Sequence, residues 1–281
     1  MVVDLMIIGS QKSATTTLFD ILQTSNKVNG SSEKEPDFFS KNNWRSGLEK
    51  YHSLFSGENS VLKLEASTQY TFYPHIENKN IVKDIYEYNP SMKFIYIIRN
   101  PVDRIISAYM HSYQSGMVSG TIDEVILENK YFIDVTRYAE QIKPYIEIFG
   151  REKILIIDFS DVVSNIDKTI SEIEFFLGVN LGISSELTKT HSNKSLNTIR
   201  IKSNFRPITN SLKMLSKYFS PKVQNFGKKI IYSIPLFHGP KFSKKPTISP
   251  ETLNYLKQEL GSQRIEMENI TGRSLSHWDS L

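Results

Sequence analysis

The chain has 281 residues, of which 39% are hydrophobic and 23% charged, a composition typical of a globular protein with a substantial core. It has no cysteine, which excludes disulfides, thiol catalysis and thiolate metal sites, and its six histidines show no H-E-x-x-H or similar spacing, so we expect no metal cofactor. The net charge is only +4, but it is unevenly distributed, because an acidic body is combined with one basic segment that would attract anions.

A strand, a loop and a helix are predicted at the start of the chain. Residues 4–8 are a short apolar run, residues 9–14 are small and polar, and residues 15–22 carry apolar side chains at helical spacing. Small residues that run from a strand into a helix form a seat for an anion, because the first N–H groups of the helix are unpaired. The order differs from the ATP loop G-x-x-x-x-G-K-[ST], since Lys12 comes three residues too early.

The first apolar run also bears on localisation. It is too short for a secretory signal and lacks the basic start of one. No stretch of the sequence approaches the roughly 18 apolar residues of a membrane span. We therefore expect a cytoplasmic protein.

A second strand and helix carry another candidate anion site. Residues 93–98 form a β-rich apolar run, Arg99 follows, and Asn100 with Pro101 predicts a helix start that continues to about residue 115. Arg99 at the strand end and Ser107 in the helix can converge on one oxyanion. Two such seats at neighbouring strands suit a nucleotide that is phosphorylated at both its 5′ and 3′ positions.

The remaining pattern predicts an α/β fold with a parallel sheet flanked by helices. A capping box at Thr121 and Glu124 indicates a further helix. Helical spacing, a buried strand and another amphipathic helix follow at residues 137–149, 153–159 and 166–177. Strands that alternate with helices favour a parallel sheet covered on both faces, with ligands at the carboxyl ends of the strands.

The C-terminal third is predicted to be an irregular basic subregion of one domain over residues 1–281. Prolines break residues 178–247 into short pieces, and a helix restarts at Ser249 and Pro250 and runs to about residue 269. Residues 187–250 contain no Asp or Glu but thirteen Lys and Arg. We expect this segment to be a lid or a dock for an anionic acceptor, with contact to a membrane surface as a further role.

Two motifs resemble those of sulfotransferases that use 3′-phosphoadenosine 5′-phosphosulfate (PAPS). I-G-S-Q-K-S-A-T-T-T-L (residues 8–18) resembles their 5′-phosphosulfate loop, and I-I-R-N-P-V-D-R-I-I-S-A-Y (residues 97–109) resembles their 3′-phosphate motif. T-G-R-S-L-S-H-W (residues 271–278) is similar to the closing segment of bacterial and glycan members. The resemblance implies a P-loop-like sulfotransferase fold, PAPS as co-substrate and no metal.

The resemblance also explains the early lysine, because in that family the lysine at this position reaches the oxygen that bridges phosphate and sulfate. It implies that Lys12 is catalytic and that the loop and the 3′-phosphate motif hold the donor. The implied donor-binding residues are Lys12, Ser13, Ala14, Thr15, Thr16, Thr17, Arg99, Ser107, Lys244 and Lys245.

The acceptor side is similar to the heparan sulfate type. E-K-E-P-D-F-F (residues 33–39) matches the acidic segment in which Glu35 would be the general base, and no histidine stands where small-molecule sulfotransferases have theirs. K-L-E-A-S-T-Q-Y (residues 63–70) matches the next segment, so Glu65 and Tyr70 are expected to contact the acceptor. The chain departs from glycan enzymes at Ala66, where they have a second lysine, and at Asp37, where a histidine is common.

We expect the acceptor to be a glycan, a glycolipid or a smaller hydroxylated metabolite, and we expect no nucleic-acid partner for such an enzyme. Two alternatives remain open at this stage. One is an ATP-dependent kinase, because K-I-L-I-I-D ends like a Walker B strand at Asp158. The other is a non-catalytic nucleic-acid or membrane-surface binder that acts through residues 187–250.

Overall fold

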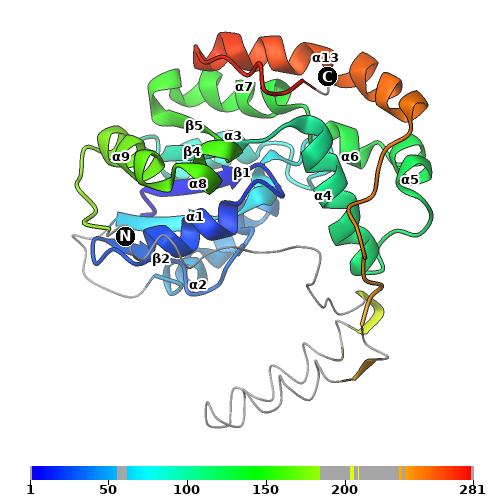
Figure 1. Cartoon of the computed structure of the whole chain (residues 1–281). Coiled ribbons are helices and arrows are strands. Elements are labelled where there is room, and N and C mark those ends of the chain that lie inside the picture. The colour runs from blue at the N-terminus through cyan, green and yellow to red at the C-terminus, as the bar shows by residue number, and fades with distance from the viewer. Residues whose placement is uncertain are drawn as a thin grey trace. The chain divides into compact units, whose positions relative to one another are not determined.

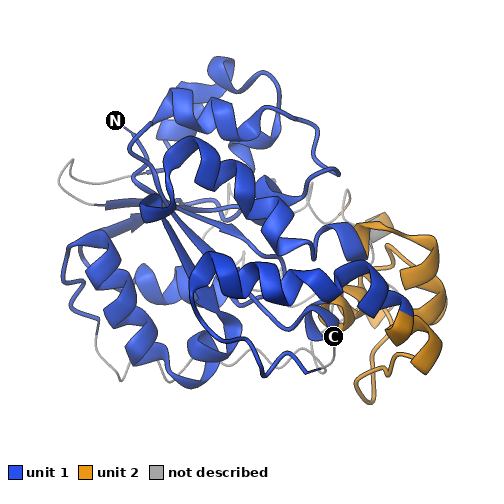
Figure 2. Cartoon of the chain, turned by 90° about the horizontal axis from the view of Figure 1, so that it is seen from above, with its two compact units in different colours: residues 1–104, 133–192, 255–281 blue, residues 105–132, 193–254 orange. Residues whose placement is uncertain are grey.

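The computed structural model describes residues 2–55, 62–183, 203–205, 208, 234–235 and 238–279. The chain forms two compact units, which Figure 2 shows in blue and orange. Unit 1 comprises residues 1–104, 133–192 and 255–281, and unit 2 comprises residues 105–132 and 193–254. That residues 1–281 act as a single domain stays a prediction.

Unit 1 contains a five-stranded parallel sheet with the order β2-β3-β1-β4-β5, which confirms the predicted fold class. The strands are β1 (Leu5–Gly9), β2 (Val28–Gly30), β3 (Leu62–Ala66), β4 (Lys93–Ile98) and β5 (Ile154–Asp158). The three apolar runs of the sequence are β1, β4 and β5. Because β1 and β4 are neighbours, the two predicted anion seats lie at adjacent strand ends.

Helices pack on both faces of this sheet (Figure 1). Alternate side chains of β1 point to opposite faces, so Leu5 and Ile7 join one core cluster while Met6 and Ile8 join the other. The first cluster includes residues of α1 (Thr15–Leu22), α8 (Phe159–Ser164) and α9 (Ile166–Leu177). The second includes residues of α2 (Leu48–His52), α3 (Ile81–Tyr88), α7 (Tyr138–Phe149) and α13 (Pro250–Thr271).

Unit 2 contains most of α4 (Pro101–Gln114), all of α5 (Ile122–Glu128) and the segment that leads to α13. The predicted capping box is present, because Thr121 and Glu124 each accept a hydrogen bond from the other's backbone N–H. Tyr109 and Tyr113 pack against Phe242 at ring-centroid distances of 5.9 and 5.2 Å. This aromatic contact joins α4 to the chain that precedes α13.

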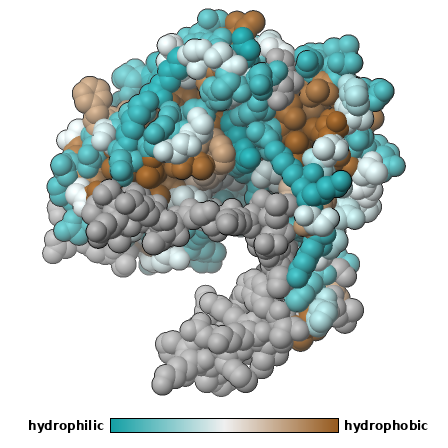
Figure 3. All heavy atoms as spheres, viewed as in Figure 1, coloured by the Kyte–Doolittle hydropathy of each residue, from teal (hydrophilic) through white to brown (hydrophobic). Residues whose placement is uncertain are grey.

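Most of the basic segment, residues 187–250, lies outside the described residues, and so does most of the stretch predicted to be irregular. Figure 3 shows a face on which hydrophilic side chains predominate and apolar side chains gather in separate patches. Within the described ranges, no helix combines the length and the apolar character needed to cross a bilayer.

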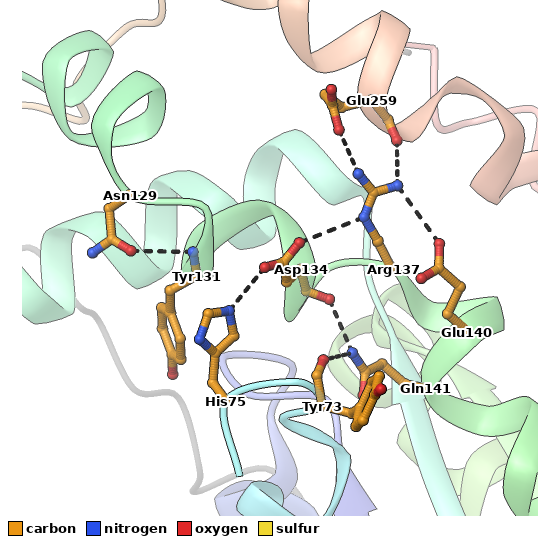
Figure 4. Close-up of polar contacts among 9 residues, drawn as sticks. All are labelled: Tyr73, His75, Asn129, Tyr131, Asp134, Arg137, Glu140, Gln141 and Glu259. Atoms are coloured by element: carbon orange, nitrogen blue, oxygen red, sulfur yellow. Dashed lines mark hydrogen bonds and ion pairs between the residues drawn. The ribbon is translucent and has the colours of Figure 1, made fainter.

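A cluster of ion pairs fastens α13 to α6 (Tyr131–Asp134) and α7 in unit 1 (Figure 4). Arg137 donates to the Glu259 carbonyl at 2.8 Å and to the Glu259 carboxylate, and it lies 3.7 Å from Asp134. Asp134 in turn pairs with His75 at 2.8 Å. One half-buried guanidinium therefore connects three segments that are distant in the sequence.

Replacing this guanidinium should destabilise unit 1. We expect Arg137→Ala to lower the free energy of unfolding by about 1–3 kcal/mol, because it leaves partly buried acceptors without their charged donor. Urea unfolding followed by circular dichroism measures the loss. Lys168→Ala is the control, since Lys168 is 63% exposed and only approaches Asp161 at 3.9 Å, so its loss should stay below about 1 kcal/mol. Equal losses in the two variants would contradict this account.

Candidate donor and catalytic site

The predicted phosphate loop connects β1 to α1 and is held by small, buried hydroxyls. Ser10 donates through its backbone N–H and its hydroxyl to the Ile97 carbonyl of β4, at 2.8 and 2.9 Å. The Ser10 and Ser13 hydroxyls are 2.7 Å apart. Gly9 must be glycine, because a Cβ there would lie 2.6 Å from the Thr71 hydroxyl and 2.7 Å from the Tyr96 ring. The loop is therefore fixed to β4, and its first residue packs closely against Thr71 and Tyr96.

The start of α1 has the features of an anion seat. Ala14 occupies the N-cap position in the left-handed conformation and provides no side-chain cap, and the first turn contains no acidic residue. The first backbone N–H groups of α1 therefore lack the side-chain acceptor that usually satisfies them. Thr15 and Thr16 add hydroxyl groups in the same turn. This combination favours binding of a phosphate or sulfate oxygen.

Arg99 follows β4 and contacts the phosphate loop directly. Its Nη1 donates to the Lys12 carbonyl at 2.8 Å, and its guanidinium stacks on the Phe159 ring at 4.2 Å. Its Nε is buried and has no hydrogen-bond partner. Burial lowers the pKa of Arg99, and the nearby Asp103 carboxylate opposes that shift. The contact with the Lys12 carbonyl therefore places a positive charge against the phosphate loop.

The expected base segment, residues 33–39, adopts an unusual backbone. Glu35 and Asp37 both have positive φ angles, 51° and 48°, on either side of Pro36. The Glu35 side chain is exposed. The preceding residue, Lys34, donates a hydrogen bond from Nζ to the Thr16 hydroxyl in the first turn of α1. The segment with the predicted base is thus in contact with the predicted donor site.

Glu65 and Tyr70, the two expected acceptor contacts, are both buried in this structure. Glu65 is 0% exposed, and its carboxylate accepts hydrogen bonds from the Ser67 and Tyr70 hydroxyls, both at 2.6 Å, and from the Tyr51 hydroxyl. Burial raises the pKa of Glu65, and the three hydroxyl donors oppose the shift. In this structure the Glu65 carboxylate therefore binds internal hydroxyl groups and has no contact with solvent.

Glu65 supports the base segment through its hydroxyl partners. The Ser67 hydroxyl accepts a hydrogen bond from the Asp37 N–H at 3.1 Å, and the Tyr70 hydroxyl accepts one from the Phe39 N–H at 3.3 Å. Two of the three hydroxyl partners of Glu65 thereby anchor the backbone that follows Glu35. Glu65 and Tyr70 thus support the base segment in this structure, and their contact with an acceptor stays a prediction.

Asp37 is a half-buried acid, which the sequence analysis noted only because glycan enzymes commonly have a histidine at its position. Its Oδ2 accepts a hydrogen bond from Gln69 Nε2 at 2.6 Å, while its Oδ1 is buried without a partner. Burial raises the pKa of Asp37 to about 7, and the negative charges of Glu35 and Glu65 add to the shift. The Ser67 hydrogen bond and the Lys41 charge oppose it. Asp37 therefore titrates near neutral pH.

Three predicted donor-binding residues belong to unit 2. Ser107 lies within α4 and is half-buried, whereas Lys244 and Lys245 are exposed in the segment before α13. Their contact with a donor stays a prediction. Sequence reasoning missed three residues that unit 1 brings to the site: Lys34, Asp37 and Phe159.

Asp158, which the kinase alternative would use to bind a metal, has other partners. Its Oδ1 caps α8 by accepting from the Ser160 N–H at 2.7 Å, and its Oδ2 pairs with His277 Nε2 at 3.1 Å. Among the described residues, no group of three or more His, Asp or Glu is placed to hold a metal ion.

Comparison with known proteins shows which family this chain resembles. A family model described as "Sulfotransferase domain" matches residues 3–226. The bifunctional heparan sulfate N-deacetylase/N-sulfotransferase 1 of Caenorhabditis briggsae is 25% identical over 197 residues, which cover 62% of this chain. Its mouse counterpart is 27% identical over 198 residues. This chain spans only 22% of the length of either protein.

Among solved structures, a sulfotransferase from Alicyclobacillus acidocaldarius matches with a TM-score of 0.67 and 21% identity, over 99% of both chains. This likeness concerns the fold alone. It confirms that the α/β architecture is that of sulfotransferases, as the two sequence motifs predicted.

The shifted pKa of Asp37 predicts a pH-dependent stability. Between about pH 4 and 7 the folded protein holds a proton that the unfolded chain releases, so the contribution of this group to stability decreases as pH rises through that window. Asp37→Asn removes the titration. The melting temperature of Asp37→Asn relative to that of the unmodified protein should therefore increase from pH 4 to pH 7 and then level off.

Differential scanning fluorimetry across pH 4–8 measures this difference. Glu49→Gln, which removes an exposed carboxylate from α2, controls for the change in net charge. A difference between Asp37→Asn and the unmodified protein that is constant over the whole range would show that Asp37 does not titrate there.

Proposed function

Because the chain belongs to the sulfotransferase domain family, we propose that it transfers a sulfuryl group from PAPS to an acceptor hydroxyl. The single observation that carries the proposal is the contact between Arg99 and the phosphate loop. Arg99 Nη1 donates to the Lys12 carbonyl of the loop that leads into the uncapped start of α1, and its Nε is buried without a hydrogen-bond partner. One donor with phosphates at both ends of its ribose suits this pair of neighbouring anion seats.

The residues of the loop fit the two ends of PAPS by their chemistry. The backbone N–H groups at the start of α1, with the Thr15, Thr16 and Thr17 hydroxyls, would bind the 5′-phosphate. Arg99 would bind the 3′-phosphate, and Ser107 is the second ligand that the sequence motif predicts. Ser13, Ala14, Lys244 and Lys245 stay candidates for the same donor. PAPS supplies the activated sulfuryl group.

In the proposed reaction the acceptor oxygen forms a bond to sulfur while the bond between sulfur and the bridging oxygen breaks. Glu35 accepts the proton of the acceptor hydroxyl. Lys12 stabilises the negative charge that develops on the phosphate oxygen of the departing 3′-phosphoadenosine 5′-phosphate (PAP). As in phosphoryl transfer, positioning and charge stabilisation provide most of the rate acceleration.

We propose a glycan or glycolipid as the acceptor. The support is the likeness of residues 33–39 to the heparan type and the names of the animal relatives, which are heparan sulfate N-sulfotransferases. Those names indicate an amine acceptor in the relatives, so the choice between hydroxyl and amine is part of the test. Ala66 and Asp37 mark this chain as different on the acceptor side.

Binding of PAP tests the donor. We expect PAP to raise the melting temperature at micromolar concentration and ATP with Mg²⁺ to have a much smaller effect, because the lysine of the loop is not in the ATP position. Isothermal titration calorimetry gives both affinities. Stronger binding of ATP with Mg²⁺ than of PAP would favour a kinase and end this proposal.

Lys12→Ala tests the catalytic lysine. We expect turnover to decrease by roughly 10²–10³, because one group that stabilises developing charge is removed. Release of PAP from PAPS in the presence of acceptor measures turnover. The variant should keep its melting temperature, and more than a tenth of the original turnover would show that Lys12 is not catalytic.

Glu35→Gln tests the base and the acceptor together. The variant should bind PAP normally but lose roughly 10²–10⁴ in turnover with a hydroxyl acceptor, because it cannot accept a proton. Heparosan, which carries hydroxyls and N-acetyl groups, and its N-deacetylated form, which adds free amines, distinguish hydroxyl from amine acceptors when supplied side by side. Normal turnover of Glu35→Gln with the preferred acceptor would exclude Glu35 as the base.

A further inference from the structure

Lys34 connects the base segment to the donor site through one hydrogen bond. Its Nζ donates to the Thr16 hydroxyl, and Thr16 belongs to the first turn of α1. The Lys34 side chain is exposed and the next residue in the chain is Glu35. The same contact therefore fixes both the position of a positive charge and the position of the expected base.

A lysine at this end of a helix is electrostatically unfavourable unless an anion is present. The first turn of a helix carries the positive end of the helix dipole, which favours acidic side chains and disfavours basic ones. Here the first turn of α1 contains no acidic residue, and the Arg99 guanidinium lies against the adjoining loop. The positive groups of Lys34 and Arg99 thus contact the first turn of α1 and the loop before it, and that turn contains no carboxylate.

The hydrogen bond from Lys34 also orients the Thr16 hydroxyl so that it can donate its proton to an anion. Because Thr16 accepts from Lys34, its own proton points away from the ammonium and is available to another acceptor. A phosphate or sulfate oxygen at the start of α1 would receive that proton and attract the ammonium at the same time. Lys34 and Thr16 then act as one unit toward the anion.

We propose that Lys34 binds the 5′-phosphosulfate group of the donor as a second positive charge beside Lys12, and that donor binding thereby fixes the segment with Glu35. The inference rests on the proposed function, since it names a further donor contact within the same site. In this proposal the base segment itself contributes a residue, Lys34, to the donor site. A donor held in this way would place its sulfur next to the residue that activates the acceptor.

Three substitutions separate the charge of Lys34 from its hydrogen bond. Lys34→Gln keeps an N–H donor for Thr16 but removes the charge, Lys34→Ala removes both, and Lys34→Arg keeps both. We expect the Gln and Ala variants to lose roughly 10- to 100-fold in turnover, at the low end of what one oxyanion contact contributes. Lys34→Arg should stay within a few-fold of the unmodified protein. Lys83→Ala, which removes an exposed lysine from α3, is the matched control and should leave turnover unchanged.

The salt dependence of PAP affinity decides whether the charge acts on the donor. Calorimetric titrations with PAP at about 50 and 300 mM salt should show a weaker dependence for Lys34→Gln and Lys34→Ala than for the unmodified protein, Lys34→Arg and Lys83→Ala. If Lys34→Gln keeps the original salt dependence and turnover, the inference is wrong and Lys34 only holds the base segment through its hydrogen bond.

The proposed function can fail separately from this inference. Loss of turnover in Lys12→Ala together with full activity in Lys34→Gln overturns only the role of Lys34. Absence of PAP binding by the unmodified protein overturns the donor itself and the role of Lys34 with it.

Discussion

The contact between the Arg99 guanidinium and the Lys12 carbonyl is the interaction on which the site in unit 1 depends. It joins the residue that follows β4 to the loop that follows β1, across two strands that are neighbours in the sheet. Parallel strands place their carboxyl ends along the same edge, so both residues arrive there without any further constraint on the chain between them. The Phe159 ring, which follows β5, supports the other face of the guanidinium. Three neighbouring strand ends therefore meet at the candidate anion site.

The sequence predicts this part of the fold because its signals are local. The apolar runs of β1, β4 and β5 are buried on both faces, which makes them uniform in hydropathy and easy to recognise. The strand β2 has only three residues, Val28–Gly30, and was not predicted. The strand β3 contains Lys63 and Glu65, which are 4% and 0% exposed, so its polarity conceals its burial. The Glu65 carboxylate is satisfied by the hydroxyls of Ser67, Tyr70 and Tyr51, and the alternation of residue types along the strand does not show these contacts.

The site residues likewise divide into those that a local motif indicates and those whose position depends on contacts elsewhere in the fold. Lys12 and Arg99 stand in motifs whose order alone indicates an anion seat, and unit 1 brings them together. The place of Glu65 depends on hydroxyls from Tyr51 and Tyr70, so a motif comparison that expected it to face an acceptor could not reveal its burial. The contact of Lys34 with Thr16 likewise depends on how the base segment folds against α1. Such contacts between distant segments become visible only in three dimensions.

The backbone of the base segment explains why the segment around the exposed Glu35 is held by many buried contacts. Positive φ angles at Glu35 and Asp37 are unfavourable for residues with a Cβ, at a cost of about 1–3 kcal/mol each, so neighbouring contacts must hold them. On the C-terminal side, Phe38 stacks on Tyr51 with ring centroids 4.0 Å apart, and Phe39 is fully buried. The Ser67 and Tyr70 hydroxyls hold the intervening N–H groups, and both donate to Glu65. Burying a carboxylate without hydrogen-bond donors is energetically unfavourable, and here three hydroxyl groups donate to Glu65. These hydroxyls therefore connect the buried carboxylate to the backbone conformation of the segment that contains Glu35.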